Sequence, residues 1–266
     1  MHPGHHRQHR VLMLALSGLL GLGTTACGDD DDDSGGLNPP VTEGLPTHDE
    51  LAQALADAQA TSNGGFGLEM WATVVDRSGI VVAVAFTGPT EDDQWPGSRV
   101  ISAQKANTAN AFSLGSLALS TANLFSATQP GGSLFGLQES NPVDPDVAYG
   151  GNVADYGTTR DFMVGKRIGG INVFGGGLPL YTADGSLVGA VGVSGDSSCA
   201  DHNIAWKLRD ALLLDNIPSG VSGTGDDNIV YDISAGASAS GWGHPECSAE
   251  ATAIGEALPT TNPVGP

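Results

Sequence analysis

The chain has 266 residues, of which 30 are Asp or Glu and 10 are Lys or Arg, giving a formal net charge of −20 at pH 7. A surface of this sign repels nucleic acid and anionic lipid headgroups, so neither is expected as a partner. The length is sufficient for one domain with a sizeable core and additional extensions.

The first 26 residues have the features of an export signal. A basic segment precedes an apolar run over 11–23, which is shorter than the roughly 20 residues of a spanning helix. The small residues before Cys27 resemble the lipobox of bacterial lipoproteins, although Thr24 stands where Leu is usual. We predict a signal peptide over 1–26 and a lipid on Cys27, which alone would anchor an exported domain to the cell envelope, in the periplasm or at the cell surface. An ordinary signal peptide cut near Ala26 is the alternative.

A solvated tether is predicted over 27–46, because an Asp run followed by Gly, Ser and Pro cannot bury a core. The segment THDE at 47–50 has capping-box spacing and begins a predicted helix over 47–62. Two strand-like runs, at 68–76 and 80–86, are separated by a short turn and predict a β-hairpin.

The middle of the chain contains a long irregular segment. A helix of small residues is predicted over 98–112, and a shorter helix is predicted to begin at 120 or 121. Residues 129–160 are rich in Gly, Pro and Asn and predict a long loop, which is either functional or an insertion. A second hairpin is predicted over 171–195, where the turn TADG separates two apolar strands.

A last helix is predicted over 201–214, with apolar residues on one face. From Asp215 onward we predict mostly loop, with one strand-like stretch at 228–233. The order of helix, hairpin, helices, hairpin and helix fits an antiparallel sheet covered by helices, which is an α+β domain. That domain is predicted over 47–215, and a C-terminal extension over 216–266.

The cysteines predict one disulfide. If Cys27 carries the lipid, Cys199 and Cys247 remain as an even pair in an oxidising compartment. A bond between them would tie the C-terminal extension to the domain, and in the chain-entropy model it contributes roughly 4 kcal/mol. A zinc site is the weaker alternative, because the two cysteines lack CxxC spacing.

Five segments occur in the order of a known family: VVDRSGIVVAVAF, a helix with AQKA, then GGGLPLY, DGSLVGAVGVSG, and Asp201 opening the last helix. Over roughly 50–212 the chain resembles the HbpS/GlcG-like family, also called the haem-degrading domain family. Two features depart from the family pattern. The usual Gln-Asp before the last helix is Ala200-Asp201 here, and 129–160 and 216–266 lie outside the common pattern.

The resemblance implies a profilin-like fold, which is an antiparallel five-stranded sheet with helices on its faces. It also implies haem, or a related tetrapyrrole, as the ligand, and assembly into a homo-oligomer. A partner protein of the cell envelope is a further prediction.

The predicted disulfide would bring His202 and His244 together, with Asp201 beside them. A helix start disfavours the imidazolium form, and neutral imidazole is the form that binds metal, so His202 is the predicted iron ligand. Asp201 would orient the ring by accepting its other N–H group. The alternative is that both histidines pack around a structural disulfide.

Basic residues are candidates for the carboxylates of a haem. Arg160, Lys166 and Arg167 lie close together in the sequence, and Arg160 or Arg167 is the expected partner of the propionates. Lys105, within the helix of small residues, is a further candidate ligand-binding residue. The alternatives are neighbouring acids as partners of the arginines and simple exposure for Lys105.

Three classes of function follow. A haem-binding protein for storage, sensing or transfer is favoured, because the sequence lacks an aromatic-lined, multi-His signature of an enzyme. A haem-degrading or other redox enzyme is the first alternative, and an assembly module without ligand is the second. No G-x-S-x-G motif and no Ser/His/Asp order indicates a hydrolase.

Overall fold

The computed structural model describes residues 39–265. The predicted signal peptide, Cys27 and most of the predicted tether lie outside the described residues and stay predictions. Within the described range, no helix combines the length and apolar character that crossing a membrane requires.

The main-domain and tail helices are α1 (His48–Gln59), α2 (Ser98–Phe112), α3 (Phe125–Thr128), α4 (Pro145–Ala148), α5 (Ser198–Ala211) and α6 (Ala249–Thr261). The strands are β1 (Trp71–Asp76), β2 (Val81–Phe86), β3 (Gly177–Tyr181), β4 (Leu187–Ser194), β5 (Ile233–Ser234) and β6 (Ala237–Ser238). Short 3-10 helices are η1 (Glu91–Asp93), η2 (Thr121–Leu124) and η3 (Val153–Asp155). The two predicted hairpins and the predicted helix over 98–112 are confirmed.

The main sheet has four antiparallel strands in the order β2-β1-β4-β3, and not the five strands that the resemblance implies. In this register Trp71 lies opposite Phe86 on one side and Ser194 on the other. The chain after α5 covers the outer edge of β3, where the backbone N–H of Tyr181 donates to the carbonyl of Leu214. The last residue of β3 is therefore paired at this edge without a further strand.

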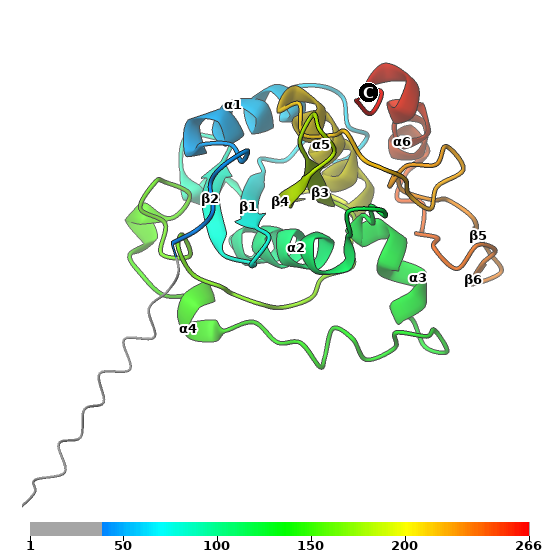
Figure 1. Cartoon of the computed structure of the whole chain (residues 1–266), viewed down its shortest axis with the longest axis horizontal. Helices are drawn as coiled ribbons and strands as arrows, with labels where there is room; N and C mark the ends of the chain where they lie inside the picture. The colour runs from blue at the N-terminus through cyan, green and yellow to red at the C-terminus, as the bar shows by residue number, and fades with distance from the viewer. Residues whose placement is uncertain (1–38, 266) are drawn as a thin grey trace, which may run out of the picture. The chain divides into compact units, whose positions relative to one another are not determined.

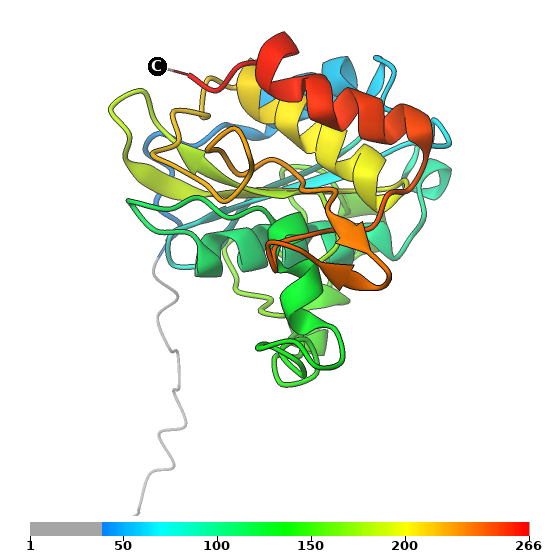
Figure 2. The same cartoon turned by 90° about the vertical axis from the view of Figure 1, so that its right-hand side faces the viewer.

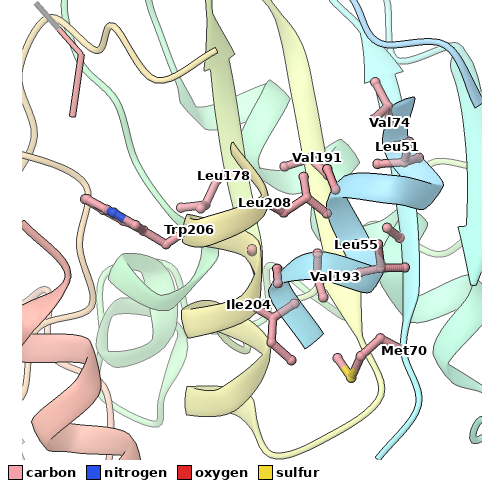
Figure 3. Close-up of a cluster of buried hydrophobic side chains, with 14 of the residues drawn as sticks. Leu51, Leu55, Met70, Val74, Leu178, Val191, Val193, Ile204, Trp206 and Leu208 are labelled. Atoms are coloured by element: carbon pink, nitrogen blue, oxygen red, sulfur yellow. The ribbon is translucent and has the colours of Figure 1, made fainter. Parts of the chain in front are cut away.

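One face of the sheet is covered by α1 and α5, and the other by α2 (Figure 1). Leu51 and Leu55 of α1 and Ile204 and Leu208 of α5 meet Val191 of β4 in the larger apolar cluster (Figure 3). These side chains are at most 3 % exposed, and each contributes about 1.5–3 kcal/mol relative to an exposed position.

Helix α2 approaches the sheet closely because β4 carries a glycine where they cross. A Cβ atom at Gly192 would overlap the carbonyl group of Ser102. The small residues Ala103 and Ala106 of α2 lie in the apolar cluster on this face. This close contact directs the middle of α2, including Lys105, toward the ends of β3 and β4.

The segment 129–160 is largely irregular, as predicted, and contains α4 and η3. A buried ion pair holds its end to α2, since Arg99 donates to Asp161 at 2.8 Å through Nε and to the carbonyl of Ala148 at 2.7 Å. The Arg99 guanidinium also lies over the ring of Tyr156, 3.6 Å from the centroid. The loop is thus folded onto the domain.

Helix α5 begins one turn earlier than predicted, at residue 198 and not 201. Ser197 is the N-cap, and its hydroxyl accepts from the backbone N–H of Ala200. The helix ends after Ala211, and Leu213 has a left-handed backbone with φ of 55°. His202 therefore lies in the second turn, and its predicted place in the first turn is wrong.

The C-terminal extension is mostly irregular, as predicted, but the prediction missed α6, which packs along α5 on its outer side (Figure 2). Ser248 caps this helix, and its buried positions are Ala251, Gly255 and Leu258. The predicted strand at 228–233 is wrong for most of its length, since only its last residue enters β5. The short β5 pairs with β6 alone.

Polar contacts hold this extension in place. Arg209 of α5 and Asp227 form an ion pair of 2.7 Å with both side chains fully buried. The indole N–H of Trp206 donates to the carbonyl of Asn262 at 2.8 Å. The predicted Cys199–Cys247 disulfide is present in the structure and links the first turn of α5 to residues before α6.

Candidate functional site

The candidate site is a pocket of about 310 Å³ between α2, the end of β4 and the start of α5. It is lined by Trp95, Ser98, Ile101, Lys105, Phe174, Ser194, Asp196, Ser198 and Asp201. Its volume is at the lower end of the range for small-molecule sites. Apolar walls over a buried ionic floor distinguish it from the larger groove beside α1, whose acids Glu50 and Asp57 are exposed.

Lys105 and Asp201 form the floor of the pocket. The ammonium Nζ donates to Asp201 Oδ2 at 2.6 Å and to the carbonyl of Val193 at 2.9 Å, and both charged residues are at most 2 % exposed. Burial lowers the pKa of Lys105 and raises the pKa of Asp201 to about 6, although each charge opposes the shift of the other. Because an ammonium has three donors, one N–H remains for an acceptor in the pocket.

Two exposed aromatic side chains line the pocket, and a third aromatic residue is bonded through its backbone to a lining residue. Trp95 is 54 % exposed and Phe174 is 46 % exposed, and both line the pocket. Phe66 is 76 % exposed, and its backbone N–H donates to Asp196, another lining residue. Large exposed apolar side chains gathered at one opening indicate a binding site for an apolar surface.

His244 of the C-terminal extension reaches the wall of this pocket. Its Nε2 is 2.7 Å from the hydroxyl of Ser198, which is the first residue of α5. Its Nδ1 is 2.7 Å from the carbonyl of Pro245. Burial lowers the pKa of His244 to about 4, so the ring is neutral near pH 7.

His202 lies in the interior and does not line the pocket. The ring is fully buried, and its Nε2 is 3.1 Å from both the side-chain oxygen of Asn228 and the backbone nitrogen of Ile229. Burial lowers its pKa to about 3, so burial, and not the helix start named in the prediction, is the main cause that favours the neutral ring. The iron-ligand role stays a prediction, and it would require a haem to reach a ring that the structure buries completely.

The predicted contact between Asp201 and the His202 ring is replaced by another arrangement. Asp201 uses Oδ2 for Lys105, and its Oδ1 accepts from the backbone N–H of Asp196 at 2.8 Å. The structure therefore joins Lys105 and Asp201, which the sequence analysis named separately.

The basic residues proposed for the propionates lie away from the pocket wall. Arg160 is paired with Asp155 at the surface, and Lys166 donates to the carbonyl of Phe162. Arg167 donates to the carbonyl of Ser78, in the turn after β1, whereas the pocket adjoins Ser194 at the opposite end of the sheet. Their propionate role stays a prediction.

Sequence reasoning missed Trp95, Phe174 and Ser198. A tryptophan in a polar loop and a serine pair before a helix were the available signals. Neither signal indicates a pocket by itself, because the pocket forms only where these segments meet Lys105.

The fold and site define an α+β domain with a buried lysine–aspartate pair beneath an apolar pocket. A family model described as "Haem degrading protein HbpS-like" matches residues 47–209. The chain belongs to this HbpS-like family. The matched residues include Lys105 and Asp201, whereas His244 lies beyond them.

Three solved structures are similar to the chain. Klebsiella pneumoniae protein ORFY is 27 % identical with a TM-score of 0.42, covering 63 % of this chain and 90 % of its own. PduOC, solved as a haem complex, is 24 % identical with a TM-score of 0.43, covering 63 % and 94 %. A double mutant of Streptomyces reticuli HbpS is 18 % identical with a TM-score of 0.40, covering 73 % and 96 %. No curated protein matches the chain significantly.

Proposed function

We propose that the chain binds haem or a related tetrapyrrole through the pocket above Lys105. The observation that carries the proposal is a pair of exposed aromatic side chains, Trp95 and Phe174, at an apolar pocket within a haem-associated family domain. Trp95 and Phe174 would contact the flat faces of the macrocycle, and Ile101 would contact its inserted edge. The pocket volume of about 310 Å³ is smaller than the macrocycle, so part of the macrocycle would remain outside the pocket.

The lining residues fit the flat faces of a tetrapyrrole and one of its carboxylate groups. The ammonium of Lys105 would donate its remaining N–H to one carboxylate, because its other two N–H groups are already bonded. Among the residues that line this pocket, no histidine, methionine or cysteine offers a ligand to iron. The proposed binding therefore depends on apolar contact and one ionic contact, and an iron ligand such as His202 would have to come from outside the residues that line the pocket.

In the proposed role, a lipid on Cys27 holds the domain at the cell envelope, where it stores, senses or transfers the ligand. Assembly as a homo-oligomer and contact with an envelope partner protein belong to the same proposal. Replacing Cys27 by Ser should release the protein from the membrane fraction. A variant that stays with the membrane would contradict the lipid anchor.

Titration of the purified protein with haemin tests the proposal. We expect a shifted Soret band that saturates, and at least ten-fold weaker binding in the double variant Trp95→Ala/Phe174→Ala. Phe135→Ala is the matched control, because Phe135 is 64 % exposed and does not line the pocket. Equal affinity of the two variants would exclude this pocket as the site.

The same titration separates the alternative functions. Bleaching of the bound spectrum after addition of a reductant would favour oxidative haem degradation. An unchanged Soret band at all protein concentrations would contradict haem binding and favour an assembly module.

A further inference from the structure

We propose that Ser198 and His244 form a nucleophile–base pair that accepts acyl groups from small apolar esters in the pocket. The proposal goes beyond haem binding and assigns a second chemistry to the same cavity. It rests on the geometry of one side chain from α5 and one from the C-terminal extension.

Hydrogen bonding fixes which nitrogen of His244 carries the proton. A carbonyl oxygen only accepts, so Nδ1, 2.7 Å from the Pro245 carbonyl, must be the protonated nitrogen. Nε2 is then the acceptor, and the Ser198 hydroxyl donates to it at 2.7 Å. This is the orientation in which a histidine removes a proton from a serine, with a carbonyl in the place of the usual carboxylate.

The surroundings of Ser198 favour negative charge on its oxygen. The backbone N–H of Gly175 donates to this oxygen at 2.7 Å. Ser198 is also the first residue of a 14-residue helix, whose N-terminus carries positive potential. The ammonium of Lys105 lines the same pocket and has an unoccupied donor for the oxygen of a bound carbonyl group.

The position of His244 is fixed from several sides. The disulfide ties the neighbouring Cys247 to α5, and the backbone N–H of His244 donates to the carbonyl of Val230 at 2.8 Å. The ring of Phe125 packs against the imidazole, with 5.1 Å between ring centroids. A histidine held at the pocket wall by a disulfide and by packing is pre-organised for proton transfer.

In the proposed reaction, Ser198 Oγ attacks the ester carbonyl carbon as its proton passes to His244 Nε2. The resulting oxyanion would be stabilised by Lys105. The bond to the leaving alcohol then breaks, and the alcohol takes the proton from Nε2, leaving an acyl group on Ser198. Water, deprotonated by the same nitrogen, hydrolyses this acyl-enzyme to a carboxylic acid and restores the hydroxyl.

A fluorophosphonate probe tests the pair in the full-length protein, with the modified residue identified by peptide mass spectrometry. We expect labelling at Ser198, hydrolysis of p-nitrophenyl butyrate, and loss of both in Ser198→Ala. His244→Gln should lower the labelling rate at least 100-fold, as expected for loss of a general base. Its disulfide content and circular dichroism are measured to confirm that the fold is retained.

Ser140→Ala is the matched control, since Ser140 is an exposed serine outside the pocket. Absence of label at Ser198, or equal ester hydrolysis by the parent and Ser198→Ala, would overturn the proposal. Pre-incubation with haemin separates the two functions. Labelling that haemin blocks supports both, whereas labelling that haemin does not affect supports the acyl-transfer pair and contradicts haem binding in this pocket.

Discussion

The family domain and the C-terminal extension are held by different forces. The sheet with α1, α2 and α5 buries continuous apolar clusters on both of its faces. The extension packs α6 against α5, with Leu258 in the larger of these clusters, and it is further fixed by individual polar or covalent contacts, which are Arg209–Asp227, Cys199–Cys247, Trp206–Asn262 and His202–Asn228. Because the extension contributes fewer side chains to the apolar clusters than the domain does, we expect it to be weakened more by the loss of one such contact.

This difference has a consequence for the pocket. The floor, Lys105 and Asp201, belongs to the domain, but His244 arrives with the extension. Loss of an anchor should therefore remove His244 from Ser198 while the floor of the pocket remains. The following predictions test the contrast from the largest expected effect to the smallest.

Replacing Asp227 by Ala should have the largest effect. Arg209 is fully buried, so loss of its partner leaves a charge without compensation in the interior. We expect the free energy of unfolding to fall by about 5 kcal/mol. Denaturant titration measures the loss, and limited proteolysis should show cleavage in the extension before the domain.

Asp155→Ala is the control for this prediction. It removes the partner of Arg160 from an ion pair whose arginine side chain is 74 % exposed. Solvent screens such a pair, so the loss should remain below about 1 kcal/mol. Equal losses in the two variants would show that burial does not decide the stability of these ion pairs.

Replacing Cys247 by Ser should have the next largest effect. The disulfide closes a loop between residues 48 positions apart, and the chain-entropy model gives about 4 kcal/mol for this length. Thermal unfolding of the parent with and without reductant should show the same loss as the variant. A reductant effect that persists in Cys247→Ser would mean that the disulfide is not its origin.

Sequence patterns predicted the domain better than the extension, for a physical reason. Periodic apolar residues report burial against a large surface, so the helix over 98–112 and both hairpins were recognisable. Helix α6 buries Ala251, Gly255 and Leu258, and it contains an internal glycine and Pro259, which normally argue against a helix. Its stability comes from contacts with α5 that no local pattern records.

The site was predictable only in part. Lys105 and Asp201 were named because they lie in two of the segments that carry the family resemblance. The two residues pair because α2 crosses close to β4. Gly192, which has no side chain, permits this close crossing. The predicted Cys199–Cys247 disulfide indicated that His244 approaches the start of α5, but no sequence signal identified Ser198 as its partner.

Replacing His202 by Gln should change the pH dependence of stability. The pKa of His202 is lowered to about 3, so its contribution is complete above the unfolded-state value of 6.5 and is lost as the pH falls toward 3. Between pH 7 and pH 5 this histidine should cost the parent about 2 kcal/mol. Asp201, whose pKa is raised to about 6, acts in the opposite direction in both proteins and cancels in the comparison.

Denaturant titrations at pH 7, 6 and 5 provide the measurement. The glutamine amide can still bond with Asn228, so the variant should remain folded at pH 7 and lose less stability on acidification. Parallel curves for the parent and the variant would show that His202 is protonated at similar pH in the folded and unfolded states.

The smallest effect is expected in the domain, at the start of α1. The Thr47 hydroxyl accepts from the backbone N–H of Glu50 and completes a capping box that the sequence predicted. Thr47→Ala should lower the free energy of unfolding by about 1 kcal/mol, because α1 carries Leu51 and Leu55 into the core.

Thr90→Ala is the matched control, since Thr90 caps η1, which has no buried residue. It should cost clearly less in the same denaturant titration. Equal losses in the two threonine variants would mean that the cap alone, and not the helix it supports, determines the loss of stability. That result would contradict the dependence of the domain on apolar packing at α1.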